Sequence, residues 1–154
     1  MKTRTIGLLL VLAAAIAVAM SLSGTASSDV IPLKVSLKSG QCTQQSDNTL
    51  HCTGSLTGLG SQTADVHVTS GFACQNQGGN QPPGQVSAQE NGIKPDKNGN
   101  ATFDVTTGAA SCPDHMQPIF TGTAQCPGEA QVDVTQQFAN GTKTTTFCIP
   151  IKPA

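Results

Sequence analysis

The positions of six cysteines are the feature that most constrains how this chain can fold. All of them follow an N-terminal segment of the kind that directs export, and they are Cys42, Cys52, Cys74, Cys112, Cys126 and Cys148. An even number of cysteines in a small exported chain indicates disulfide bonds, which form and persist outside the reducing cytoplasm. We therefore expect an extracellular protein whose fold depends on three cross-links.

The N-terminal segment has the three parts of a secretory signal peptide. Two basic residues within the first four positions precede an apolar run over 6–20, and Gly24-Thr25-Ala26 supplies the small residues that signal peptidase recognises. The apolar run is shorter than the roughly 20 residues that a membrane-spanning helix needs. We expect residues 1–26 to be cleaved and residues 27–154 to form one secreted domain without a membrane span.

The charge of the expected mature chain excludes one class of partner. Residues 27–154 contain six lysines, no arginine and nine acidic residues, which gives a net charge near −3. Nucleic-acid-binding proteins use clustered basic residues to contact phosphates, so we do not expect nucleic acid as a partner. Leu, Ile, Val and Phe make up less than a fifth of these residues. Such a thin core is what small secreted domains reinforce with disulfides.

Hydrophobic residues alternate with polar residues in several short segments of the chain. This period of two predicts strands with one buried face. No segment after residue 26 keeps a helical period for three turns, so we expect an all-β protein. The alternation runs through Leu33–Leu37, Leu50–Leu56, Val66–Val68, Phe103–Val105 and Val132–Val134.

Two Asn-Gly dipeptides lie between pairs of these segments. Asn98-Gly99 separates 86–94 from 101–107, and Asn140-Gly141 separates 131–138 from 142–149. Asn-Gly favours the positive φ angles of a type I′ turn, so each predicts a β-hairpin. Together with the other segments they predict an antiparallel, immunoglobulin-like sandwich of about seven to eight short strands stapled by disulfides. The core Trp typical of immunoglobulin domains is absent.

Six cysteines allow fifteen disulfide pairings, and their spacing alone does not choose among them. The order of the expected strands favours three. Cys42 and Cys52 flank the polar connection between the first two segments, and Cys126 and Cys148 flank the last hairpin. Cys74 and Cys112 then remain, one before and one after the middle hairpin.

The segment after Cys74 differs in character from the rest of the chain, because its glycines and prolines oppose regular structure and its amides offer many hydrogen-bonding groups. Binding residues concentrate on such loops when a rigid scaffold holds them. The alternative is an ordered connector that Cys74 anchors. The candidate binding loop consists of Asn76, Gln77, Gly78, Gly79, Asn80, Pro82 and Pro83.

The same segment carries a family resemblance. Cys74-x-Asn76-x-Gly78-Gly79-Asn80-x-Pro82-Pro83-Gly84 resembles the signature of a group of small secreted bacterial proteins that are largely uncharacterised. Gly58-Leu59-Gly60, the stretch from Gly99 to Phe103, and Cys112-Pro113 match other parts of their pattern. The resemblance implies a β-sandwich and supports a Cys74–Cys112 bridge. It implies no activity.

Metal binding and catalysis have little support in the sequence, and we expect no cofactor. Cys112 lies near His115 and Met116, a set of residue types found in copper sites, but copper would need Cys112 as a free thiolate. The acidic and amide residues of 96–104 lack the glycine and glutamate positions of a calcium loop. Neither a Gly-x-Ser-x-Gly elbow nor a His-Glu-x-x-His helix is present, so we do not expect an enzyme.

Three classes of function remain. We expect a secreted, non-catalytic binding module whose partner is an unidentified protein or surface outside the cell or on the cell envelope. The alternatives are an inhibitor of an extracellular hydrolase and a structural surface protein without a discrete site. An inhibitor loop usually carries a strong side chain at its apex, whereas Gln77 to Asn80 offers only amides and glycines.

Overall fold

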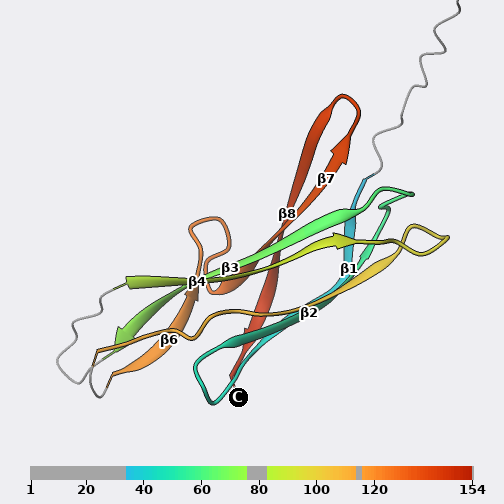
Figure 1. Cartoon of the computed structure of the whole chain (residues 1–154). Helices are drawn as coiled ribbons and strands as arrows, with labels where there is room; N and C mark the ends of the chain where they lie inside the picture. Colours follow the sequence, from blue (N-terminus) through green and yellow to red (C-terminus); the bar gives the residue numbers. More distant parts are fainter. Residues whose placement is uncertain (1–33, 76–82, 114–115, 154) are drawn as a thin grey trace, which may run out of the picture. The chain divides into compact units, whose positions relative to one another are not determined.

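The computed structural model describes residues 34–75, 83–113 and 116–153. Within these ranges the chain forms β-strands and no helix, as the alternating pattern predicted (Figure 1). The strands are β1 (Ser36–Gln44), β2 (Leu50–Thr57), β3 (Ala64–Gln75), β4 (Pro83–Ile93), β5 (Ala101–Thr106), β6 (Gln117–Gly122), β7 (Glu129–Phe138) and β8 (Gly141–Lys152).

The strands follow one continuous path in the order β4-β3-β7-β8-β1-β2-β5. β3 has β4 along one edge. Its other edge is shared, because β7 pairs with Ala64–Thr69 and β6 pairs with the following stretch from Gly71 to Gln75. β4 and β5 end the path and are not ladder partners, but a Glu90 Oε2 atom accepts a hydrogen bond of 3.0 Å from the N–H of Asp104.

One pairing departs from the expected antiparallel sandwich. β1 and β8 run parallel, with Cys42 opposite Ile151 and Thr43 opposite Lys152, while the other strand pairs are antiparallel. The sheet is therefore mixed, and β8 joins β7, its antiparallel neighbour, to β1, its parallel neighbour. The expectation of a purely antiparallel sandwich is wrong on this point, and an immunoglobulin-like arrangement is not confirmed.

The core consists of the inward-facing residues of the predicted alternating segments. Leu50, Cys52, Gly54 and Leu56 are buried on β2, and the residues between them face outward. Val66 and Val68 of β3 and Val132 and Val134 of β7 follow the same pattern, as do Phe103 and Val105 of β5. In the first predicted segment Val35 is buried while Lys34 and Ser36 are exposed, as the alternation predicted, but β1 begins only at Ser36 and Leu33 lies outside the described residues.

All three disulfides that strand order favoured are present. Cys42–Cys52 joins directly opposite residues of β1 and β2, Cys74–Cys112 closes a separation of 38 residues, and Cys126–Cys148 closes one of 22. All six cysteines are bonded. Bridges of this kind typically stabilise a small domain by about 2–4 kcal/mol each, which offsets the thin core.

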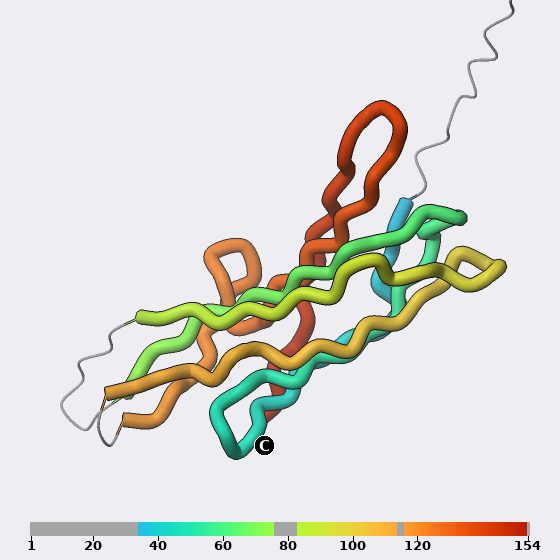
Figure 2. The backbone as a smooth tube through the Cα atoms, in the orientation of Figure 1, coloured from blue at the N-terminus to red at the C-terminus, as the bar shows by residue number. Residues whose placement is uncertain are grey.

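One of the two predicted hairpins is wrong. β7 and β8 form a hairpin around Ala139 and Asn140, with Phe138 opposite Gly141. The connection through Asn98 does not join paired strands, because β4 pairs with β3 and β5 pairs with β2 (Figure 2). Neither turn is of type I′, since neither Asn98 nor Asn140 has a positive φ.

Candidate binding groove

The outward face of β1, β2 and β5 carries a dense set of hydroxyl groups. Because β2 buries every second residue, Thr53, Ser55 and Thr57 lie on its outer side. Thr102 and Asp104 are the corresponding exposed residues of β5. The pairing of Gly54 with Phe103 brings the two strands together, and a Cβ atom at Gly54 would lie 2.4 Å from the Phe103 ring. Glycine at position 54 therefore lets the Phe103 ring pack inside while the hydroxyls face outward.

Two shallow depressions lie along this face and a third lies beyond it at the β4–β5 connection, and neighbouring depressions share lining residues. The first, of about 500 Å³, and the second, of about 530 Å³, both include Ser55 and Thr102. The third, of about 470 Å³, shares Pro95 and Asp96 with the second and ends at the turn that contains Gly99. We call the three together the polar groove. It runs from Asp104 past Lys38 of β1 and along the β4–β5 connection to Asn98.

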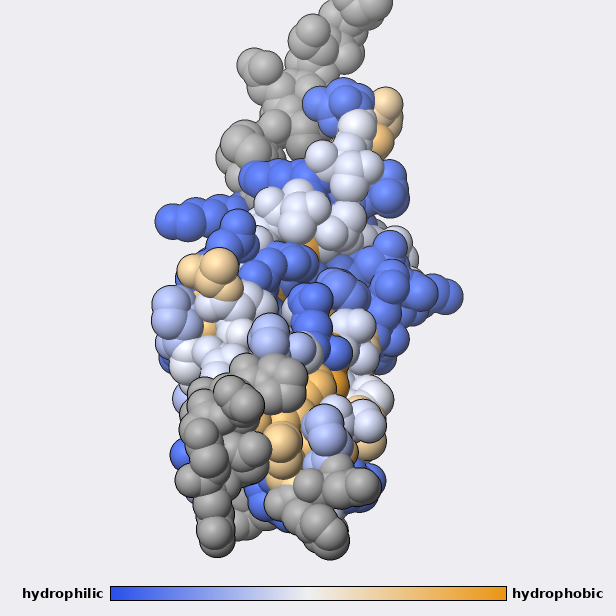
Figure 3. Space-filling view, turned by 90° about the vertical axis from the view of Figure 1, so that its left-hand side faces the viewer, coloured by the Kyte–Doolittle hydropathy of each residue, from blue (hydrophilic) through white to orange (hydrophobic). Residues whose placement is uncertain are grey.

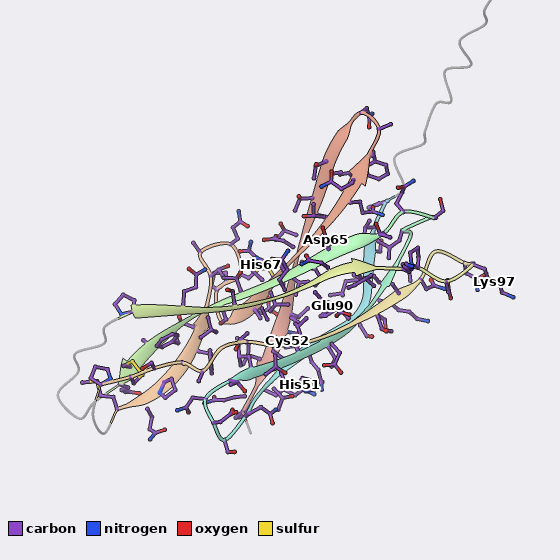
Figure 4. All side chains as sticks on the ribbon, in the orientation of Figure 1. His51, Cys52, Asp65, His67, Glu90 and Lys97 are labelled. Atoms are coloured by element: carbon purple, nitrogen blue, oxygen red, sulfur yellow. A yellow bond between two sulfur atoms is a disulfide. The ribbon has the colours of Figure 1, made fainter. Side chains whose placement is uncertain are left out.

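Two lysines give the middle of the polar groove its charge. Lys38 of β1 and Lys94, just after β4, are both exposed and line the second depression with Thr57 and Asn100. Neither lysine makes an ion pair with any residue in the described parts of the chain. Lys97 lies farther along, at the tip of the β4–β5 connection (Figure 4).

The carboxylate of Asp96 does not neutralise these lysines directly, because it is already bonded within its own turn. It accepts hydrogen bonds from the N–H groups of Asn98 and Asn100, both at 2.8 Å, and from the side-chain amide of Asn100 at 3.2 Å. These bonds, the Asn100 N–H first, lower the pKa of Asp96 below its usual value. The turn therefore carries a negative charge in the same depression as Lys38 and Lys94, but among the described residues neither ammonium group forms an ion pair with it.

The far end of the polar groove contains the closest pair of ionisable side chains in the described residues. His51 Nε2 lies 2.7 Å from Asp104 Oδ1, across the β2–β5 ladder. Both side chains are substantially exposed, at 41% and 72%, and Glu90 binds the backbone of Asp104 from β4 (Figure 4). No group of three or more His, Cys, Asp or Glu side chains in the described ranges could hold a metal ion.

The sequence did not identify this groove. His51 and Asp104 are 53 residues apart, and only the pairing of β2 with β5 brings them together. Lys38 and Lys94 are likewise brought together by strand order. The alternating pattern does place Asp104 on the outer face, but it does not say which strand lies beside it.

The candidate binding loop lies mostly outside the described residues, which exclude Asn76, Gln77, Gly78, Gly79, Asn80 and Pro82. Pro83 is described and begins β4 opposite Ala73. Cys74, almost fully buried, anchors the preceding strand to Cys112 with a Cα–Cα distance of 5.5 Å. This disulfide leaves Cys112 without the thiolate that a copper site would need.

The rest of the described surface offers little for apolar docking. Seen from the end that lies at the left of Figure 1, the described surface is mostly hydrophilic or intermediate, and a hydrophobic area lies in the lower half of the view between the grey segments (Figure 3). Among the described residues, Ile119 of β6 is the one large hydrophobic side chain that is exposed, at 45%. The polar groove is therefore the better candidate for ligand binding.

Comparison with known proteins adds no functional information. No protein-family model matches the chain, and no curated protein shows significant similarity to it. In the ranges that the structure describes, no helix is long and apolar enough to cross a membrane. The resemblance to small secreted bacterial proteins stays a prediction that rests on the motif around Asn76.

Proposed function

We propose that this protein is a non-catalytic binding module that acts outside the cell or on the cell envelope, and that the polar groove is its ligand-binding surface. The observation that carries the proposal is the pair of exposed lysines, Lys38 and Lys94, which make no ion pair with a described residue and lie beside the hydroxyls of Ser55, Thr57 and Thr102. Ammonium groups and hydroxyls together bind carboxylate or phosphate oxygens.

The groove also suggests the form of the ligand. The two depressions on the outer face share lining residues, and the second shares others with the third at the β4–β5 connection, so an extended chain fits them better than a compact molecule does. The described residues of the groove contain no aromatic side chain on the outer face, which disfavours stacking on neutral sugar rings. An extended polymer with repeated carboxylate or phosphate groups matches this surface.

The proposed function also requires that the protein is secreted. Three disulfides are consistent with an extracellular protein. Removal of residues 1–26 by signal peptidase and an immunoglobulin-like arrangement of the strands remain parts of the proposal. N-terminal sequencing of protein recovered from culture medium tests the cleavage.

The binding experiment uses two probes, oligogalacturonate for carboxylates and inorganic polyphosphate for phosphates. We expect one of them to shift backbone NMR signals along the polar groove, and we expect the affinity to fall as salt is added. Lys38→Gln and Lys94→Gln should each weaken binding by about fivefold, since an exposed charge pair contributes up to about 1 kcal/mol. Lys143→Gln, with the same change in charge on the β7–β8 hairpin, should bind normally.

Several outcomes contradict the groove as the site. Equal loss of affinity in the Lys143→Gln control would show that only net charge matters. If neither probe shifts groove signals, the ligand class is wrong. The loop is tested separately by replacing Asn76, Gln77 and Asn80 with Ala. If that variant loses capture of an extracellular partner and melts normally while Lys94→Gln still captures it, the loop is the binding site.

A further inference from the structure

β8 has a long edge without a partner. Along one side it pairs with β7 from Gly141 to Pro150. Along the other side it pairs with β1 only at Ile151 and Lys152. In the described parts of the chain, the edge of β8 from Gly141 to Cys148 therefore has no ladder partner, and every second residue directs its N–H and C=O groups away from β7. β1 lies beside β8 from Ile149 onward, since a Cβ atom at Gly40 would lie 2.9 Å from the Ile149 Cγ2 atom. Figure 2 shows how the hairpin extends beyond the neighbouring strands.

The other free edges of the sheet carry features that hinder strand addition. β5 has only six residues, and Glu90 already accepts a hydrogen bond from the N–H of Asp104. β6 is equally short and contains Pro118, which cannot donate to a ladder. β4 begins at Pro83 and has a bulge at Gly92, where the register with β3 shifts. Charges, prolines, bulges and short length are the means by which proteins protect edge strands.

The edge of β8 lacks these features. From Gly141 to Ile149 it has no proline and no register shift against β7, and its one charged residue is Lys143. Its centre is Thr144-Thr145-Thr146-Phe147, which consists of β-branched and aromatic residues that favour strands. Exposed segments of this kind, with high strand preference and low charge, readily pair with another strand.

We propose that β8 pairs in antiparallel fashion with β8 of a second copy of this chain, about a two-fold axis at Thr145. In this register Thr144 lies opposite Thr146 of the second copy, and Lys143 lies opposite Phe147 of the second copy. A two-fold contact is self-complementary and uses the β8 edge of each copy, so neither copy keeps a free β8 edge and the assembly stops at a dimer. The sheet then continues from β7 through both β8 strands to β7 of the second copy.

The charges of the segment fit a second copy. In the proposed register the two Lys143 side chains are separated by four residues along the strands, which is about 13 Å. That distance exceeds the Debye length of about 8 Å at physiological salt, so their repulsion is largely screened. The same register brings the ammonium group of each Lys143 to the Phe147 ring of the second copy, which is partly buried against its own core, so that a cation–π contact forms across the interface.

Sedimentation of the secreted, fully oxidised protein over a series of concentrations tests the dimer. We expect a reversible equilibrium between monomer and dimer. Thr144→Lys should lower the association constant at least tenfold, because it places two further cations at the centre of the interface, where charges oppose strand addition. The matched control is Thr106→Lys on β5, the same substitution at an exposed edge position, which should leave the association constant unchanged.

Each other outcome overturns the proposal. A monomer at all concentrations, equal weakening by both variants, or no weakening by Thr144→Lys rules out the β8 edge. Growth into larger assemblies rules out two-fold closure. Amide exchange gives an independent readout, since alternate amides from Thr142 to Cys148 should become protected as the concentration rises. Full protection of these amides at the lowest concentration would mean that another part of the same chain covers the edge.

Discussion

The two Asn-Gly connections of this protein have similar sequences and different structures. Asn98-Gly99 lies between β4 and β5, which do not pair with each other, whereas Asn140-Gly141 lies between β7 and β8, which pair up to the last residue before the turn. The dipeptide makes the chain reverse in both places. Whether the reversal becomes a hairpin depends on which strand the chain pairs with after the turn: β5 pairs with β2, whereas β8 pairs with β7.

The first connection is held by contacts outside itself. The Gly99 carbonyl accepts a hydrogen bond of 3.0 Å from the N–H of Leu59, and the Gly99 N–H donates to the carbonyl of Asp96 at 3.0 Å. Leu59 is fully buried, and its carbonyl accepts a hydrogen bond from the side chain of Gln136 on β7. These bonds attach the connection to Leu59, which follows β2, and the chain then continues into β5 beside β2.

The second connection is held almost entirely by its own ladder. Beyond Gln136, where the pairing of β7 with β3 ends, only β8 supports the hairpin. Among the described residues, the one side-chain hydrogen bond across its tip joins the Thr142 hydroxyl to the Gln137 amide oxygen at 3.0 Å, and both residues are exposed. The tip is therefore a local structure on which the core does not depend.

The largest effect is expected at Gly99. Its φ is +77°, and an added Cβ atom would lie 2.9 Å from the backbone nitrogen of Gly60. Gly99→Ala should lower the free energy of unfolding by about 2–4 kcal/mol, which combines left-handed strain of about 1–2 kcal/mol with the displacement of backbone. Chemical denaturation measures the change.

Gly128 provides a matched control for Gly99. Its φ is +76°, and an added Cβ atom would meet no atom within 4 Å. Gly128→Ala should therefore cost only the strain of about 1–2 kcal/mol. Equal losses for the two variants would show that the contact of Gly99 with Gly60 contributes nothing, and that the first connection is no more tightly held than an ordinary turn.

The sequence predicted the parts of the fold that depend on neighbouring residues. Alternation placed Val66, Val132 and Phe103 inside, and strand order selected Cys42–Cys52 and Cys126–Cys148, because cysteines that flank a turn between paired strands come close together. Cys74–Cys112 was the remaining pair, and it forms although the middle hairpin that it was expected to flank does not. These features depend on the period of a strand and on local reversal, which a short segment determines by itself.

The sequence did not predict which strands become partners. Nothing within Ala101–Thr106 distinguishes β2 from β4 as its neighbour, and the parallel contact of β1 with β8 joins residues more than 100 positions apart. The polar groove depends on those partners, so Lys38, Lys94 and the His51–Asp104 pair were not predicted as a site. The hairpin prediction at Asn98 failed because bonds to Leu59 outweigh the preference of the dipeptide.

A smaller and pH-dependent effect is expected at Asp96. Its hydrogen bonds lower its pKa in the folded state below the value of 3.8 that an unperturbed carboxyl has. The stabilisation is therefore fully present above about pH 4 and is lost as the pH falls through the folded-state pKa. Asp96→Asn, which keeps one acceptor oxygen and removes the charge, should be less stable than the wild type at pH 6 and should approach it near pH 2.

Thermal melting between pH 2 and pH 6 measures this convergence, with Lys97→Gln as a control for the charge of the same turn. The second connection contains no carboxylate between Gln137 and Thr142. After correction for the intrinsic exchange rate, amide exchange at the hairpin tip should not change over the same range. A difference between wild type and Asp96→Asn that stays constant with pH would show that the ionised carboxylate does not hold the turn.

The smallest effect is expected at Thr142, on the tip of the β7–β8 hairpin. Thr142→Val removes the hydroxyl that bonds to Gln137 and keeps the shape and the strand preference of the side chain. Because both partners are exposed, water replaces the lost bond, and the free energy of unfolding should change by about 0.5 kcal/mol or less. The change should instead appear as faster amide exchange confined to the tip, since a hairpin end opens without the core. A global loss above about 1 kcal/mol would mean that the tip is coupled to the core as firmly as the turn at Gly99, and the two connections would no longer differ.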